Sequence, residues 1–244
     1  MPDLTRPDHL PNLRDGRRPP EPSWLPRQRR GITPQMIGRY PDYNVFDAAG
    51  TWDEATARVI AERMDVRTQF QFFTAGEQPT LQALCDVAVA QDAEPRIPVA
   101  ELIDEKLAAG RLDGYQYADM PDDRETWHLV LAGLDEVTAT RHDGRRFADL
   151  DAPAQEDIVE AFTKGRLQSA SFDGLNVSRA WSVCMRMILG AFYSHPWAWN
   201  EIGFGGPAYP RGFMRLGPMS TREPFERPGA TDEDPVRTVA EGNM

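Results

Sequence analysis

Signals that start and stop helices recur from residue 51 to about residue 193 and limit the folds open to this chain. Thr74-Ala-Gly-Glu77 is a capping box, in which the side chains at both ends satisfy backbone N–H groups left over at a helix start. Pro98, Pro121 and Asp151 mark further starts, each followed by apolar residues at helical spacing. Nothing alternates with a period of two for long enough to predict a strand. The sequence therefore predicts an all-α fold, a compact domain of about five to six helices with extended, irregular N- and C-terminal arms.

The first predicted helix runs from Thr51 to about Met64, with Thr51 as its N-cap and Asp53 in its first turn. Later helices start at Thr74, Pro98, Pro121, Asp151 and about Leu175. The last of these, ending near Tyr193, is apolar on most sides, which is typical of the central helix of a domain. Three pairs of neighbouring carboxylates are interpreted as capping or solvated groups: Asp104-Glu105, Asp122-Asp123 and Glu156-Asp157.

Residues 192–213 form an aromatic, proline- and glycine-rich segment directly after that apolar helix. Aromatic side chains supply large contact areas, while Gly and Pro favour a non-repetitive backbone path, so an irregular segment is predicted. Two interpretations stay open: the segment packs onto the chain's own helices, or it presents a shaped surface to another protein. The candidate partner-binding residues are Tyr193, His195, Trp197, Trp199, Glu201, Phe204, Gly205, Gly206, Pro207, Tyr209, Arg211 and Phe213.

Catalytic and cofactor-binding patterns are weak throughout the chain. His195 and Glu201 could form an acid–base pair, which would make the chain a small self-sufficient enzyme. A simpler interpretation is that His195 ends a helix, either as a cation at the negative end of the dipole or hydrogen-bonded to a carbonyl. No Cys/His cluster has metal-ligand spacing, and Gly203-Phe-Gly-Gly206 lacks the spacing of a dinucleotide loop. We therefore predict no catalytic, cofactor-binding or metal-binding residue in this chain.

Cysteine positions, net charge and the length of apolar runs each limit what can be predicted about this chain. Cys85 and Cys184 fall within predicted helices and are expected to be buried, although their pairing cannot be read from sequence. A net charge of −11 and a pI near 4.9 argue against a nucleic-acid partner. No run of about 18 apolar residues predicts a membrane span.

The two ends of the chain differ from its middle. Residues 1–50 form a Pro-rich arm that is either disordered or docked against the body or a partner, and residues 218–244 form an acidic tail predicted to be disordered. Neither Arg17-Arg18 nor Arg29-Arg30 leads into the apolar stretch of an export signal. A cytoplasmic location is expected, or a periplasmic one if a partner carries the signal. The predicted helical domain spans residues 51–217.

Several motifs over residues 68–217 together resemble one family, that of gluconate 2-dehydrogenase subunit 3. The earlier ones are Phe72-Phe-Thr-Ala-Gly-Glu77, Pro98-Val-Ala-Glu-Leu-Ile103, Gly144-Arg-Arg-Phe147 with Leu150, and Phe192-Tyr-Ser-His-Pro196. The closing one, Glu201-Ile-Gly-Phe-Gly-Gly-Pro-Ala-Tyr-Pro-Arg-Gly-Phe213, is the most specific.

This resemblance implies a helical accessory subunit that has no cofactor of its own. Its partner would be an FAD-dependent GMC-type oxidoreductase acting on a sugar, sugar acid or polyol, which it helps to mature, stay soluble or reach its compartment. A structural or electron-relay role in the same complex, with a cytochrome c subunit alongside, is the alternative. Many relatives carry a twin-arginine signal, and the lack of an apolar stretch here favours a cytoplasmic complex.

Overall fold

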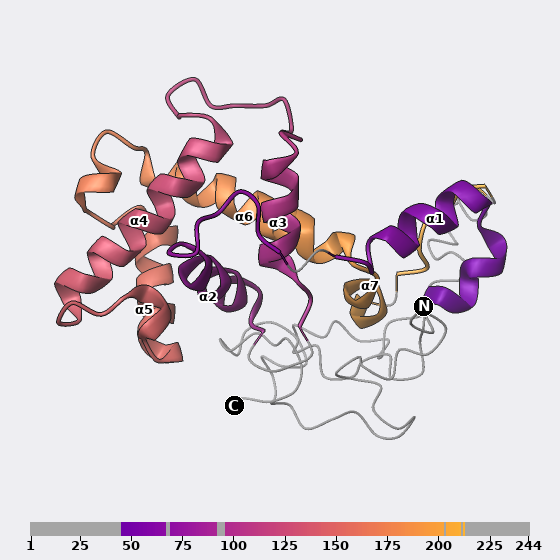
Figure 1. The fold of residues 1–244 in the computed structure, drawn as a ribbon, viewed down its shortest axis with the longest axis horizontal. Helices are drawn as coiled ribbons and strands as arrows, with labels where there is room; N and C mark the ends of the chain where they lie inside the picture. The colour runs from indigo at the N-terminus through magenta and orange to yellow at the C-terminus, as the bar shows by residue number, and fades with distance from the viewer. Residues whose placement is uncertain (1–44, 67–68, 92–95, 203, 211, 213–244) are drawn as a thin grey trace, which may run out of the picture. The chain divides into compact units, whose positions relative to one another are not determined.

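The computed structural model describes residues 45–66, 69–91, 96–202, 204–210 and 212, and these residues form helices and no strand (Figure 1). The all-α prediction is thereby confirmed. The elements are the 3-10 helices η3 (Val45–Thr51), η4 (Phe147–Asp149) and η5 (Ala170–Phe172) and the α-helices α1 (Glu54–Glu62), α2 (Gln78–Val89), α3 (Val99–Ala108), α4 (Asp123–Arg141), α5 (Ala152–Thr163), α6 (Val177–Ser194) and α7 (Pro196–Ile202). Residues 1–44 of the predicted arm and the predicted tail 218–244 lie outside the described residues.

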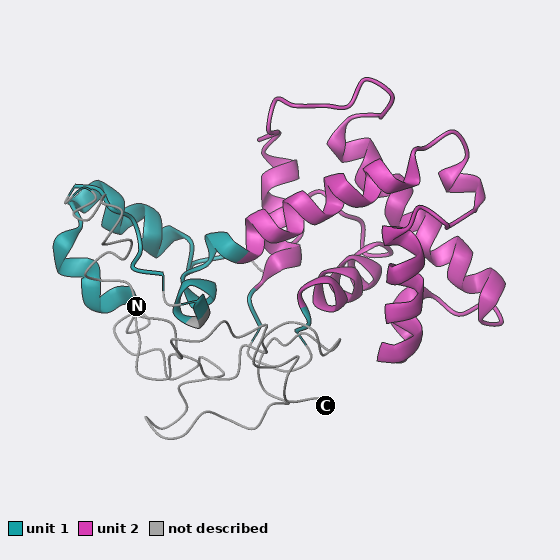
Figure 2. Cartoon of the chain, turned by 180° about the vertical axis from the view of Figure 1, so that it is seen from behind, with its two compact units in different colours: residues 1–66, 90–97, 193–244 teal, residues 67–89, 98–192 magenta. Residues whose placement is uncertain are grey.

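The chain divides into two compact units (Figure 2). Unit 1 takes its described residues from 1–66, 90–97 and 193–244, and unit 2 comprises 67–89 and 98–192. This division falls inside the predicted domain 51–217, whose outer boundaries stay predictions.

Aspartate caps fix where several helices begin. The carboxylates of Asp53, Asp122 and Asp151 each accept the backbone N–H three residues ahead, at 2.8, 2.9 and 3.1 Å. These bonds satisfy N–H groups that have no partner inside the helix. The predicted N-cap Thr51 is wrong: it ends η3, where its hydroxyl donates to the Ala48 carbonyl. Asp53 is the N-cap of α1.

Within unit 2, α2 contacts α3, α4, α5 and η4. Its buried side chains include Leu81, Leu84 and Cys85. The prediction that α6 is central and apolar on most sides is wrong. One face of α6 is buried, but Leu189 on the opposite face is exposed. Although α6 is rich in apolar residues, those that are buried lie on one face of the helix.

A buried carboxylate fastens the segment before α2 to α3. Asp104 is only 2% exposed, and its oxygens accept the backbone N–H groups of Gln71, Phe72 and Phe73 at 2.7, 2.9 and 2.8 Å. The interpretation of Asp104 as a capping or solvated group is therefore wrong. Phe73 in turn packs edge-on against Trp127 of α4, with ring centroids 6.0 Å apart. A single side chain thus holds this segment over the core of unit 2.

Gly133 lets η5 approach the middle of α4. A Cβ built on this glycine would lie 2.5 Å from Cζ of Phe172, closer than atoms in contact can come. The Phe172 ring is buried and stacks on Phe162 at 6.0 Å. Glycine normally weakens a helix interior, so its presence here reflects this close packing.

The two cysteines are free and buried in unit 2, as expected of small apolar side chains. Burial raises the pKa of both thiols, which keeps them protonated and unreactive. Among the helices that could be searched, none is long and apolar enough to cross a membrane.

Candidate partner-binding site

The segment predicted to be irregular contains a short helix, α7. The prediction is wrong over Pro196–Ile202, because proline at the first helical position has the φ angle that a helix needs. His195 stands just before it, and its Nδ1 accepts the backbone N–H of Trp197 at 3.3 Å. His195 is therefore a side-chain cap for α7.

Trp199 is the centre of the site in unit 1. Its ring is buried with Val45, Ala48, Trp52 and Ile60 in one apolar cluster. Its Nε1 donates to the carbonyl of Tyr193 at 2.7 Å. A buried indole N–H usually needs such an acceptor, so this bond holds α7 against the backbone at Tyr193 within unit 1.

Arg63, at the end of α1, contacts both Trp199 and the backbone just before α7. Its guanidinium lies 5.5 Å from the centre of the Trp199 ring, and it donates to the carbonyl of Ser194 at 3.1 Å. A cation over an indole face is attracted by the electrons of the ring. The end of α1 is thereby fastened to Ser194 and to α7, all within unit 1.

Asn200 was not among the candidate residues, yet it makes the longest-range hydrogen bond of the site. It is 0% exposed, and its Oδ1 accepts the backbone N–H of Val45 at 2.7 Å. Its Nδ2 has no hydrogen-bond partner among the described residues, and the same holds for Nε1 of Trp52. This pairing could not be predicted from the sequence, because a single Asn among apolar residues does not indicate which distant backbone group it will bind.

Gly206 shows why the glycine-rich turn needs glycine. Its φ is +75°, and a Cβ built there would lie 3.0 Å from both Trp52 and Val45. Any larger residue would be strained and would push against η3. The turn therefore packs closely against the chain's own N-terminal helices, and Gly205 beside it is buried as well.

Among the remaining candidate residues three aromatic ones are exposed, and we call them the aromatic rim. Tyr193, Phe204 and Tyr209 are 43%, 38% and 66% exposed, and the Phe204 ring also meets Trp199 edge-on at 5.6 Å. Trp197 and Pro207 are half-buried. Arg211, Phe213 and the side chain of Glu201 lie outside what the structure describes. Trp199 and Gly206 thus pack inward, as the first of the two open interpretations expects, while the rim faces solvent. Binding of another protein by the rim stays a prediction.

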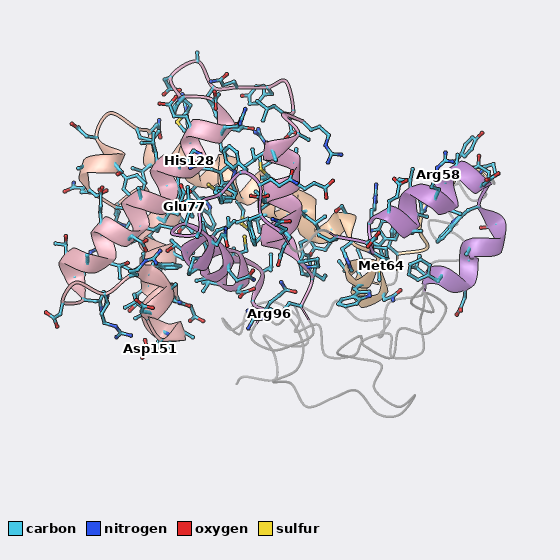
Figure 3. The ribbon with its side chains drawn as sticks, in the orientation of Figure 1. Arg58, Met64, Glu77, Arg96, His128 and Asp151 are labelled. Atoms are coloured by element: carbon cyan, nitrogen blue, oxygen red, sulfur yellow. The ribbon has the colours of Figure 1, made fainter. Side chains whose placement is uncertain are left out.

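Unit 2 contains a second feature, an open groove of about 610 Å³ beside Phe72. On its wall, Nδ1 of His128 and Oε1 of Glu77 are 2.5 Å apart (Figure 3). The other Glu77 oxygen accepts from the backbone N–H and the hydroxyl of Thr74, so the glutamate half of the predicted capping box is confirmed. The Thr74 hydroxyl donates to Glu77 instead of accepting a backbone N–H. His128 had no signal in the sequence because its partner lies 51 residues away.

Unit 2 is expected to lose part of its stability in acid through Glu77. Burial alone would raise the pKa of Glu77, but hydrogen bonds from His128 and Thr74 outweigh it and leave the pKa below its ordinary 4.5. A lowered folded-state pKa stabilises the fold fully above pH 4.5, and this contribution disappears as the pH falls through the lowered value. We expect Glu77→Gln to cost about 1 kcal/mol at pH 7 and clearly less at pH 3. Urea unfolding at both pH values measures this, with the exposed Glu125→Gln as control; an equal cost at both values would contradict it.

Comparison with known proteins places this region in a known family. A family model described as Gluconate 2-dehydrogenase subunit 3 matches residues 75–206, more than half of the 244-residue chain. No curated protein and no solved structure matches the chain. In the described part of the chain, no group of three or more His, Cys, Asp or Glu residues is placed to hold a metal ion. The matched range includes α2 to α7 and ends at Gly206.

Proposed function

The chain belongs to the gluconate 2-dehydrogenase subunit 3 family, and on that premise we propose that it is a non-catalytic accessory subunit of a dehydrogenase complex. Its partner is a GMC-type oxidoreductase that carries FAD and oxidises a sugar, sugar acid or polyol. By binding that enzyme while its flavin site is forming, the subunit keeps it soluble and favours its flavin-loaded state. The observation that carries this proposal is the aromatic rim of Tyr193, Phe204 and Tyr209, of which the first two lie near the end of the family-matched range and Tyr209 just beyond it.

The rim has the composition and support expected of a docking surface. Tyrosine and phenylalanine are enriched at the centres of protein interfaces, where they bury large areas at low entropic cost. Phe204 rests against the buried Trp199, and Gly206 anchors the following turn, so the rim stands on a packed base. A surface that is already ordered loses little entropy on binding. Contact with a partner is therefore the role that suits this segment best.

Co-expression with an FAD-dependent GMC-type dehydrogenase from the same organism tests the proposal. We expect the yield of soluble dehydrogenase, and its flavin-to-protein absorbance ratio, to rise several-fold when this chain is present. The double variant Phe204→Ala/Tyr209→Ala should lose most of that gain. Tyr115→Ala is the matched control, because Tyr115 is a similarly exposed tyrosine in unit 2. An unchanged yield and flavin content with and without this chain would rule the proposal out.

A further inference from the structure

The inner face of α7 and the turn at Gly206 are covered by a segment that lies outside the family-matched range. Residues 45–52, which we call the cover, place Val45, Ala48 and Trp52 against Trp199. Val45 and Trp52 also pack on Gly206. The family match begins only at residue 75. The cover over α7 therefore comes from a stretch of the chain outside the family-matched range.

The cover fits its site incompletely. Asn200 accepts the Val45 N–H through Oδ1, but its Nδ2 finds no acceptor in the described residues. Burial of Trp52 likewise leaves its Nε1 without an acceptor there. Buried polar groups are nearly always hydrogen-bonded, and an unsatisfied donor opposes the burial that creates it. Closing the cover thus leaves two donors unsatisfied, and opening it would return the Trp52 N–H to water.

The half-satisfied Asn200 amide indicates what could replace the cover. A side-chain amide has an acceptor and a donor side by side, and can pair with the C=O and N–H of an extended main chain. The cover supplies the N–H, from Val45, but no carbonyl for Nδ2. An extended segment of a partner chain would supply both, and its apolar side chains would take the place of Trp52 over Trp199.

We propose that residues 45–52 are a displaceable cover, and that an extended segment of the catalytic dehydrogenase subunit takes its place against Trp199, Asn200 and Gly206. This inference rests on the proposed function and extends it to the mode of binding. The exposed rim makes first contact, and exchange of the cover then completes the interface. The partner binds only chains whose cover is open. The apparent dissociation constant of the complex is therefore the intrinsic one divided by the fraction of chains that are open.

Hydrogen exchange on the wild-type chain, alone and with the purified FAD-dependent subunit, gives the direct test. On complex formation the amides of residues 45–52 are expected to lose protection, while those of 196–202 keep or gain it. Greater or unchanged protection of residues 45–52 in the complex would overturn the proposal. If no complex forms at all, it is the proposed function that fails, which the binding measurement itself reveals.

Two substitutions of Trp52 distinguish the effect of opening the cover from the effect of removing the indole N–H. Trp52→Ala removes the main apolar anchor, so the cover opens and the dissociation constant for the FAD-dependent subunit should fall about tenfold or more. Trp52→Phe keeps an aromatic ring but removes the unsatisfied N–H, so the cover stays closed and binding should be no tighter than that of the wild type. Equal or weaker binding by Trp52→Ala, with the helical content of the chain retained, contradicts the proposal.

A variant of Asn200 tests the pairing itself. In the open Trp52→Ala background, Asn200→Ala removes both halves of the amide pairing, and we expect affinity to fall at least tenfold. The rim residues are the same in the double variant and in Trp52→Ala alone, so the difference between the two would report on the covered face. If the double variant binds as tightly as Trp52→Ala alone, Asn200 does not contact the partner and the proposed mode of binding is wrong.

Discussion

Replacement of Asp104 with alanine is expected to lower the free energy of unfolding of the chain by about 4 kcal/mol. The variant would leave the backbone N–H groups of Gln71, Phe72 and Phe73 without their acceptor. Phe73 is buried, Phe72 is half-buried and Gln71 is exposed, so water can reach part of the gap. Each buried donor that loses its partner costs about 1–3 kcal/mol, and water entering the gap recovers part of this. Urea unfolding followed by circular dichroism would measure the loss.

Two controls identify the cause. Asp104→Asn keeps the shape and one acceptor oxygen but points an NH₂ group at a backbone donor, so it should cost about 2 kcal/mol. Glu105→Ala, on the same helix, removes an ion pair with Arg111 at the surface and should cost less than about 1 kcal/mol. If Asp104→Ala were no worse than Glu105→Ala, the buried carboxylate would not be what holds this segment.

Local signals in the sequence located the helices well. Asp122 and Asp151 cap helices that were predicted at those positions, because a cap and its first turn lie within four residues of each other. The same rule misled at Asp104, whose neighbours in sequence are the helix residues around it. Its true partners lie more than 30 positions earlier. A carboxylate that bonds at such a distance looks, in sequence, like one that faces water.

The candidate site was predicted as a segment and only in part as a structure. Aromatic and glycine content located residues 193–213, but which side chains face inward depends on Val45 and Trp52, which lie about 150 residues earlier. Sequence spacing carries no information about such contacts. Asn200 was missed for this reason. The short helix α7 was missed because glycine and proline dominate the composition of the stretch, whereas its first residue, Pro196, favours a helix start.

Filling the gap at Gly133 is the second substitution with a large expected effect. Gly133→Val would place a branched side chain where a single Cβ would already lie 2.5 Å from Phe172, so the ring and η5 would have to move. Valine favours a helix slightly more than glycine does, which offsets a few tenths of a kcal/mol. Overpacking of a close-packed core outweighs this gain, and we expect the unfolding free energy to fall by about 3 kcal/mol in urea denaturation.

The neighbouring position and a compensating change make this expectation specific to the contact. Ala132 is exposed on the same helix, so Ala132→Val should cost only about 0.5 kcal/mol, the difference in helix preference. Phe172→Leu shortens the side chain that meets residue 133, and in that background Gly133→Val should cost clearly less than in the wild type. If the cost of Gly133→Val is the same in both backgrounds, the destabilisation comes from the helix itself and not from its contact with η5. The absence of a side chain at residue 133 is thus predicted to matter because η5, more than 35 residues further along the chain, packs directly on the α4 backbone there.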